Sequence, residues 1–116
     1  MKTDRDIQLD ALGDPTRRAI FDLLTREERA VGELAERFPI SRPAVSQHLR
    51  VLTDAGLLTV RRDGTRRLYA ADPSGIAKLA ASVERFWRDA LVAFKAAAEP
   101  PPDPPRSDAP PSEEKP

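Results

Sequence analysis

The sequence predicts a small, mainly α-helical domain with one β-hairpin, in the order α-α-α-α-β-β-α. Apolar residues recur at spacings of three and four along residues 7–56, which is typical of helices that bury one face. Between residues 58 and 70 the spacing changes to every second residue on both sides of Asp63-Gly64, as in two strands joined by a tight turn. Helical spacing returns after Asp72-Pro73 and continues to about Glu99.

The first two predicted helices have clear start signals. Thr3 and Asp6 have the spacing of a capping box, and Gly13 follows the first helix. Asp14-Pro15 supplies a cap and a first helical residue for the second helix, which runs to about Arg26. The large apolar residues of the first helix are Ile7, Leu9 and Leu12. The apolar residues of the second helix are Ala19, Ile20, Leu23 and Leu24.

The third predicted helix is short and runs from about Val31 to Phe38. Ala30 is a poor cap for it because alanine has no side-chain acceptor, and Pro39 helps to end it. We expect it to bury Val31, Leu34, Ala35 and Phe38.

The fourth predicted helix has the strongest signals in the chain. Ser41 can cap it, Ile40 can pack against Val45 as a hydrophobic staple, and Gly56 can close it in a left-handed conformation. Its buried stripe consists of Val45, Leu49 and Leu52.

The face of the fourth helix opposite that stripe is polar. At about 100° per residue, it carries Pro43, Ser46, Gln47 and Arg50, with Arg42 at its margin. A guanidinium can bind guanine O6 and N7 together, and a glutamine can bind adenine N6 and N7. Residues 38–56 therefore have the pattern of the turn and second helix of a DNA-reading helix-turn-helix.

The predicted hairpin has a strongly basic tip. Leu58 and Val60 alternate with polar residues on the first strand, and Leu68 and Ala70 do so on the second. The tip reads R-R-D-G-T-R-R, so four arginines lie on two strand ends joined by a turn that tolerates positive φ.

The last predicted helix is long and broadly apolar. Its apolar face carries Ile76, Leu79, Val83, Phe86, Trp87, Leu91 and Phe94. A domain of this size has a modest core, so a face this wide leaves apolar surface that a second copy of the chain can cover.

The charges of the chain are balanced in total but not locally. The sequence has 19 basic and 19 acidic residues, yet Ser41–Arg67 contains six arginines against Asp54 and Asp63. Affinity for nucleic acid depends on local neutralisation of phosphates. The neutral total is compatible with DNA binding and predicts modest non-specific affinity.

Composition also excludes several classes of protein. The chain has no cysteine, which excludes disulfides, thiolate metal sites and thiol nucleophiles. No G-x-S-x-G elbow, phosphate loop or paired metal ligands accompany the lone His48, so an enzyme is disfavoured. No apolar signal core or membrane-length apolar run is present, and we expect a cytoplasmic protein.

We expect one folded domain, residues 1–99, followed by a disordered tail at residues 100–116. The tail holds eight of the twelve prolines and no large apolar residue.

Four phrases of the chain, taken in order, resemble the winged-helix repressors of the arsenic-repressor (ArsR/SmtB) family. They are L-G-D-P-T-R-R-A-I-F-D-L-L, V-G-E-L-A-E-R, S-R-P-A-V-S-Q-H-L-R-V-L-T-D-A-G-L-L and R-R-D-G-T-R-R-L-Y. The resemblance covers about Leu9 to Ala98. It implies a winged helix-turn-helix homodimer in which the first and last helices pair. It also implies that two recognition helices enter successive major grooves, the wings follow the flanking backbone, and a nearby promoter is repressed.

The resemblance does not imply metal sensing for this chain. Metal-sensing members place cysteines beside the recognition helix, or histidines and carboxylates on the last helix. Those positions are empty here, and His48 alone supplies too few donors for a soft metal, even from two subunits. The chain is more similar to cysteine-free members with a Phe-Trp pair on the last helix, here Phe86-Trp87, several of which act as autorepressors. We expect no metal and no cofactor.

The predicted function is that of a sequence-specific, homodimeric DNA-binding repressor acting on a palindromic operator in duplex DNA. The predicted DNA-binding residues are Ser41, Arg42, Ser46, Gln47 and Arg50 on the helix and Arg61, Arg62, Arg66 and Arg67 on the wing. The predicted dimer-interface residues are Ile7, Leu79, Val83, Phe86, Trp87, Leu91 and Phe94.

Alternative interpretations remain open. The winged helix can serve protein contacts instead of DNA, or a pocket between the last helices can bind a small molecule. His48 is favoured as a structural side chain over a DNA backbone contact. Phe86 and Trp87 can also belong to the core of a monomer.

Overall fold

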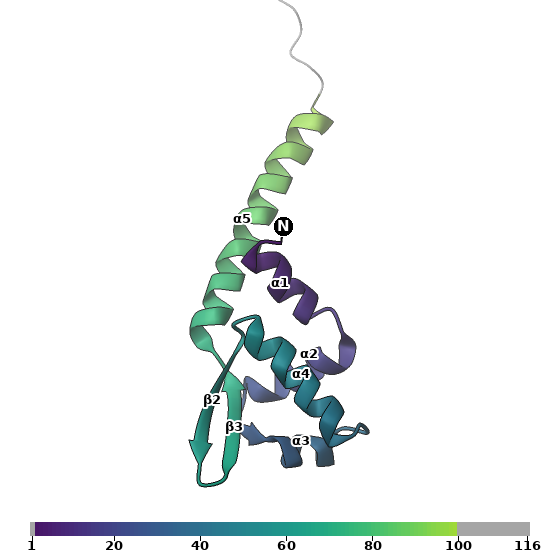
Figure 1. Cartoon of the computed structure of the whole chain (residues 1–116). Helices are drawn as coiled ribbons and strands as arrows, with labels where there is room; N and C mark the ends of the chain where they lie inside the picture. Colours follow the sequence, from purple (N-terminus) through teal and green to yellow (C-terminus); the bar gives the residue numbers. More distant parts are fainter. Residues whose placement is uncertain (1, 100–116) are drawn as a thin grey trace, which may run out of the picture. The chain divides into compact units, whose positions relative to one another are not determined.

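The computed structural model describes residues 2–99. The elements, shown in Figure 1, are α1 (Asp4–Ala11), α2 (Pro15–Leu24), β1 (Arg29–Ala30), α3 (Val31–Arg37), α4 (Arg42–Asp54), β2 (Leu58–Asp63), β3 (Arg66–Ala71) and α5 (Pro73–Ala98). The predicted mainly α-helical class with a small hairpin is confirmed. Contacts divide the chain within α5, between Arg85 and Phe86, so that residues 2–85 and residues 86–99 form separate units. The tail predicted at residues 100–116 lies outside the described residues.

The predicted starts of α1 and α2 are confirmed. Thr3 Oγ1 accepts a hydrogen bond from the Asp6 N–H at 3.1 Å, and the Thr3 N–H donates to the Asp6 carboxylate at 3.2 Å. Asp14 accepts from the Arg17 N–H at 2.8 Å, and this hydrogen bond lowers the pKa of the Asp14 carboxyl. Helix α2 ends at Leu24, slightly before the predicted end.

Only one of the two capping hydrogen bonds of a capping box forms at the start of α3. Ala30 supplies no side-chain cap, as predicted, but its N–H donates to the Glu33 carboxylate at 2.9 Å. Leu34 is fully buried, whereas the other residues predicted to be buried, Val31, Ala35 and Phe38, are half-buried against the core.

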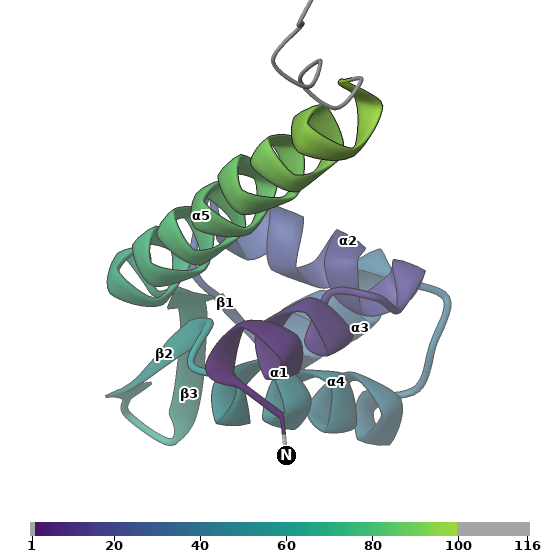
Figure 2. The same ribbon diagram turned by 90° about the horizontal axis from the view of Figure 1, so that it is seen from above.

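The core of residues 2–85 lies where α2, α3 and α4 meet. Its fully buried residues are Ile20, Leu24, Leu34, Val45, Leu49, Leu52 and Leu57. A buried leucine or isoleucine side chain contributes about 1.5–3 kcal/mol, so the stripe predicted for α4 anchors that helix. Helix α1 lies beside α4 in Figures 1 and 2, and it buries Gln8 and Ala11 while Ile7 and Leu9 remain exposed.

The sheet has three antiparallel strands in the order β1-β3-β2. The two-residue strand β1 was not predicted, and it adds a strand to the hairpin, with Ala30 opposite Leu68. Asp63 pairs with Arg66, so Gly64 and Thr65 alone form the turn. Gly64 has φ +66°, a left-handed conformation that glycine adopts readily.

The start of α5 lies against the turn that follows α4. The Asp72 N–H donates to the Leu57 carbonyl at 2.9 Å, and Gly75 is buried. A Cβ atom placed on Gly75 would lie 1.9 Å from the carbonyl oxygen of Gly56, which itself has φ +78°. Backbone therefore packs directly on backbone here.

The second unit is the C-terminal part of α5. The rings of Phe86 and Trp87 meet edge to face, with centroids 6.0 Å apart. Trp87, Leu91 and Phe94 are 59%, 59% and 71% exposed. Within residues 2–99, no helix has the length and apolar character to cross a membrane.

Candidate nucleic-acid interface

Helix α4 presents the predicted polar face to solvent. Ser41 Oγ accepts a hydrogen bond from the Ala44 N–H at 3.3 Å, so this hydroxyl caps the helix. The exposed residues of the face are Arg42, Pro43, Ser46, Gln47 and Arg50. Because the opposite stripe is buried in the core, these side chains are held outward on a rigid element.

Two hollows connect this face of α4 to the hairpin. The first is lined by Arg42 and Ser46 together with Arg66 and Arg67. The second is lined by Ser46 and Arg50 together with Arg67 and Tyr69. Both contain Ser46, Arg67 and Tyr69, so the helix and the wing form one continuous surface.

The same surface contains two residues that the sequence did not identify. Tyr69 lines both hollows while its ring packs partly against the core. Thr53 lines the second hollow, and its buried Oγ1 has no hydrogen-bond partner within residues 2–99. Strand alternation places Tyr69 on the same face as Arg67, which is a signal that was present in the sequence.

The register of the hairpin separates its four arginines into two pairs. Arg62 lies directly opposite Arg67, whereas Arg61 lies opposite Leu68 and Arg66 opposite Asp63. Side chains alternate along a strand, so Arg62 and Arg67 share one face of the sheet. Like charges placed opposite each other are mutually destabilising, and neither arginine has an ion pair within the described chain. An anion bound between them would relieve this repulsion.

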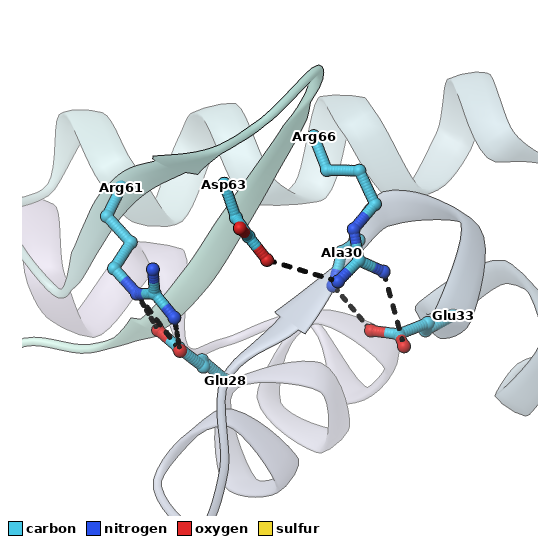
Figure 3. A network of polar contacts seen from close by, with 6 residues as sticks. All are labelled: Glu28, Ala30, Glu33, Arg61, Asp63 and Arg66. Atoms are coloured by element: carbon cyan, nitrogen blue, oxygen red, sulfur yellow. Dashed lines mark hydrogen bonds and ion pairs between the residues drawn. The ribbon is translucent and has the colours of Figure 1, made fainter.

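The other two arginines contact carboxylates, as Figure 3 shows. Arg61 Nε donates to both carboxylate oxygens of Glu28 at 3.0 Å, and Arg61 Nη2 also donates to this carboxylate. Arg66 lies 3.6 Å from both the Glu33 and the Asp63 carboxylates. The structure thus places all four predicted wing residues on the hairpin, but Arg61 and Arg66 already have anionic partners.

Two carboxylates of this network, Glu28 and Glu33, have lowered pKa values, which favours their charged form. Hydrogen bonding by Arg61 lowers the pKa of Glu28, and Glu28 in turn raises the pKa of Arg61. The hydrogen bond from the Ala30 N–H lowers the pKa of Glu33, with a further contribution from Arg66. Glu28 and Glu33, which we call the acidic edge, were not identified from the sequence.

His48 is half-buried on the other side of α4. Its Nδ1 lies 3.5 Å from Arg17 Nη1, and Arg17 Nη2 donates to the Asp10 carbonyl at 3.3 Å. These contacts agree with the structural interpretation of His48. Within the described part of the chain, no group of three or more His, Asp or Glu side chains could hold a metal ion.

The residues predicted for the dimer interface occupy different environments. Ile7 is exposed on α1, while Leu79 and Val83 are half-buried, with Leu79 packed on the core of its own chain. Phe86, Trp87, Leu91 and Phe94 are exposed on α5. Their role as a subunit interface stays a prediction.

The helix pair α3–α4 and the basic hairpin define a winged helix-turn-helix protein. In agreement with this class, the family described as "Helix-turn-helix domain" matches residues 12–61.

Similar proteins include two curated relatives and one solved structure. HTH-type transcriptional regulator Rv2034 of Mycobacterium tuberculosis is 54% identical over 84 residues, covering 72% of this chain and 78% of the relative. Transcriptional repressor SdpR of Bacillus subtilis is 44% identical over 60 residues, covering 52% of this chain and 67% of the relative. A solution structure from Mycobacterium bovis is 31% identical with a TM-score of 0.61, covering 74% of this chain and 80% of that chain. It is described as the homodimeric winged helix-turn-helix DNA-binding domain of a possible ArsR-family transcriptional regulator.

The chain belongs to the ArsR family of helix-turn-helix transcriptional regulators. It is a DNA-binding transcriptional repressor and not an enzyme.

Proposed function

We propose that two copies of the chain pair through α1 and α5 and bind duplex DNA at an operator with two-fold symmetry. The observation that carries this proposal is the continuous surface formed by the exposed face of α4 and the hairpin, where Arg67 has no ion pair among residues 2–99. Such a surface combines side chains suited to base edges with cations suited to phosphates.

The position of each side chain decides whether we assign it to base contacts or to phosphate contacts. Arg42, Ser46, Gln47 and Arg50 enter the major groove, because they lie on the exposed face of a helix narrow enough to fit there. Arg62 and Arg67 contact phosphates or the minor groove beside it. Bound across a promoter, the protein would block access of the polymerase.

The proposed pairing is supported by the exposed apolar side chains of α5 and by the homodimeric state of the similar M. bovis domain. A two-fold dimer presents two recognition helices to half-sites about 34–36 Å apart, or a multiple of this. The operator would therefore be palindromic.

The direct experiment is a gel shift with the region upstream of the protein's own gene, followed by a footprint. We expect a shift at about 50 mM salt and a protected segment with inverted symmetry. An unrelated duplex of equal length is the control. Phosphate contacts are strong at this low salt concentration. If no duplex shifts there, the DNA-binding proposal is wrong, and the winged helix is better explained as a surface that binds another protein.

Gln47→Ala is expected to weaken operator binding by about 1–3 kcal/mol and to relax the base preference at one position. Its binding to random duplex should hardly change, because Gln47 is assigned to a base edge. Titrations of operator, operator mutants and random DNA measure both effects. Equal losses on operator and random DNA would contradict this role.

Arg67→Ala is expected to weaken binding to every duplex and to reduce the slope of log K against log salt by about 0.9. The reason is that Arg67 has no anionic partner in the described chain and can neutralise a phosphate. Arg26→Ala, which removes an exposed arginine just after α2, away from the hairpin, is the control and should leave the slope unchanged.

A further inference from the structure

We propose that Glu28 and Glu33 limit the sequence-independent part of DNA affinity by holding Arg61 and Arg66 away from the phosphates. They are positioning residues of the wing, and this inference rests on the proposed DNA-binding function. Of the four arginines at the hairpin tip, only Arg62 and Arg67 are then available to the DNA backbone.

The contact between Glu28 and Arg61 spans the width of the sheet. Glu28 directly precedes β1 at one edge, and Arg61 lies on β2 at the other edge. Leu68 of β3 lies between them, since it pairs with Ala30 on one side and with Arg61 on the other. The ion pair thus ties the outer strand of the wing to the strand that leads into α3, as Figure 3 shows.

The geometry of this contact makes it difficult for Arg61 to bind a DNA phosphate. Its guanidinium donates through Nε and Nη2 to one carboxylate, an arrangement that uses the same donors as a bidentate phosphate contact. A phosphate must therefore displace Glu28 instead of adding to it. Arg66 is held more weakly, at 3.6 Å from each of two carboxylates.

The electrostatic consequence concerns every duplex, irrespective of sequence. Each additional phosphate that a protein neutralises steepens the salt dependence by about 0.9 in the logarithmic slope. A wing with two partnered arginines neutralises fewer phosphates than its composition suggests. The acidic edge therefore lowers affinity for operator and random DNA by a similar factor.

The test is the isosteric variant Glu28→Gln in the full-length protein, with Asp22→Asn as the matched control. Both substitutions remove one negative charge from a carboxylate–arginine pair, but Asp22 is exposed and pairs with Arg26 just after α2, whereas Glu28 is half-buried. We expect Glu28→Gln to tighten binding to random and operator duplexes about three- to tenfold at 0.1 M salt, with a slope steeper by about 0.9. Asp22→Asn should leave the slope unchanged.

A double variant identifies the cation responsible. In Glu28→Gln/Arg61→Gln the gain should disappear, because Arg61 is the group that Glu28 releases. Arg61→Gln alone should leave the wild-type slope unchanged, in contrast to Arg67→Ala.

Three results would overturn the inference. They are equal behaviour of Glu28→Gln and Asp22→Asn, a gain that persists in the double variant, and a loss of binding in a folded Glu28→Gln protein. If the wild-type protein binds no duplex at all, the proposed function itself fails, which is a different outcome.

Discussion

Leu91→Glu is expected to convert the proposed dimer to a monomer and to lower operator affinity at least about 100-fold. Leu91 is 59% exposed on α5 and does not belong to the core formed by the described residues 2–99. A carboxylate placed in an apolar subunit interface loses its hydration without gaining a hydrogen-bond or ion-pair partner. Without this interface, each recognition helix must bind its half-site alone, and the avidity of the linked pair is lost.

Analytical ultracentrifugation and operator titration measure the two effects of Leu91→Glu. Ala96→Glu is the matched control, since it introduces the same charge at an exposed position about 140° from Leu91 and about 80° from Phe86 around the helix. That variant should remain dimeric. If Leu91→Glu also sediments as a dimer and binds the operator with wild-type affinity, the subunit interface lies elsewhere and the proposed pairing through α5 is wrong.

Gly75→Ala is expected to destabilise the fold by about 3 kcal/mol, at the upper end of the usual cost of overpacking. The added methyl carbon would lie 1.9 Å from the Gly56 carbonyl oxygen, and backbone cannot rotate away as a side chain can. The start of α5 would have to move from the turn after α4, and the hydrogen bond from the Asp72 N–H to the Leu57 carbonyl would be strained.

Urea unfolding followed by circular dichroism measures the change caused by Gly75→Ala. Gly32→Ala is the matched control, because its methyl group would meet only the mobile end of the Arg42 side chain, at 2.9 Å. Alanine is also the better helix former by about 0.5–1 kcal/mol, so the control should be neutral or stabilised. Equal free energies of unfolding for the two variants would show that the start of α5 can move away from Gly56 without destabilising the fold.

Most of the fold could be predicted because its signals are local. The starts of α1, α2 and α4 are signalled by the capping residues Thr3, Asp14 and Ser41, and the hairpin turn is signalled by Asp63-Gly64. Strand β1 escaped prediction because two residues show no period, and its pairing with β3 joins segments far apart in sequence. The contact of Gly75 with Gly56 escaped for the same reason, since it depends on tertiary packing.

The candidate site was predictable in composition but not in its ion pairs. Helical spacing alone assigns Ser46, Gln47 and Arg50 to the exposed face of α4. By contrast, Glu28 and Arg61 are 33 positions apart, and only the arrangement of the three strands brings them together. An arginine-rich tip therefore indicated four equivalent cations, whereas the structure distinguishes two free from two partnered ones among its described residues.

The order of the strands is also expected to protect the protein against aggregation. Open strand edges can template the growth of cross-β assemblies, and natural proteins block them with charge or with short strands. The β2 edge carries adjacent arginines at positions 61 and 62, and the β1 edge is only two residues long before the chain turns into a helix. We therefore expect high solubility and little amyloid-type stacking at the concentrations used in calorimetry.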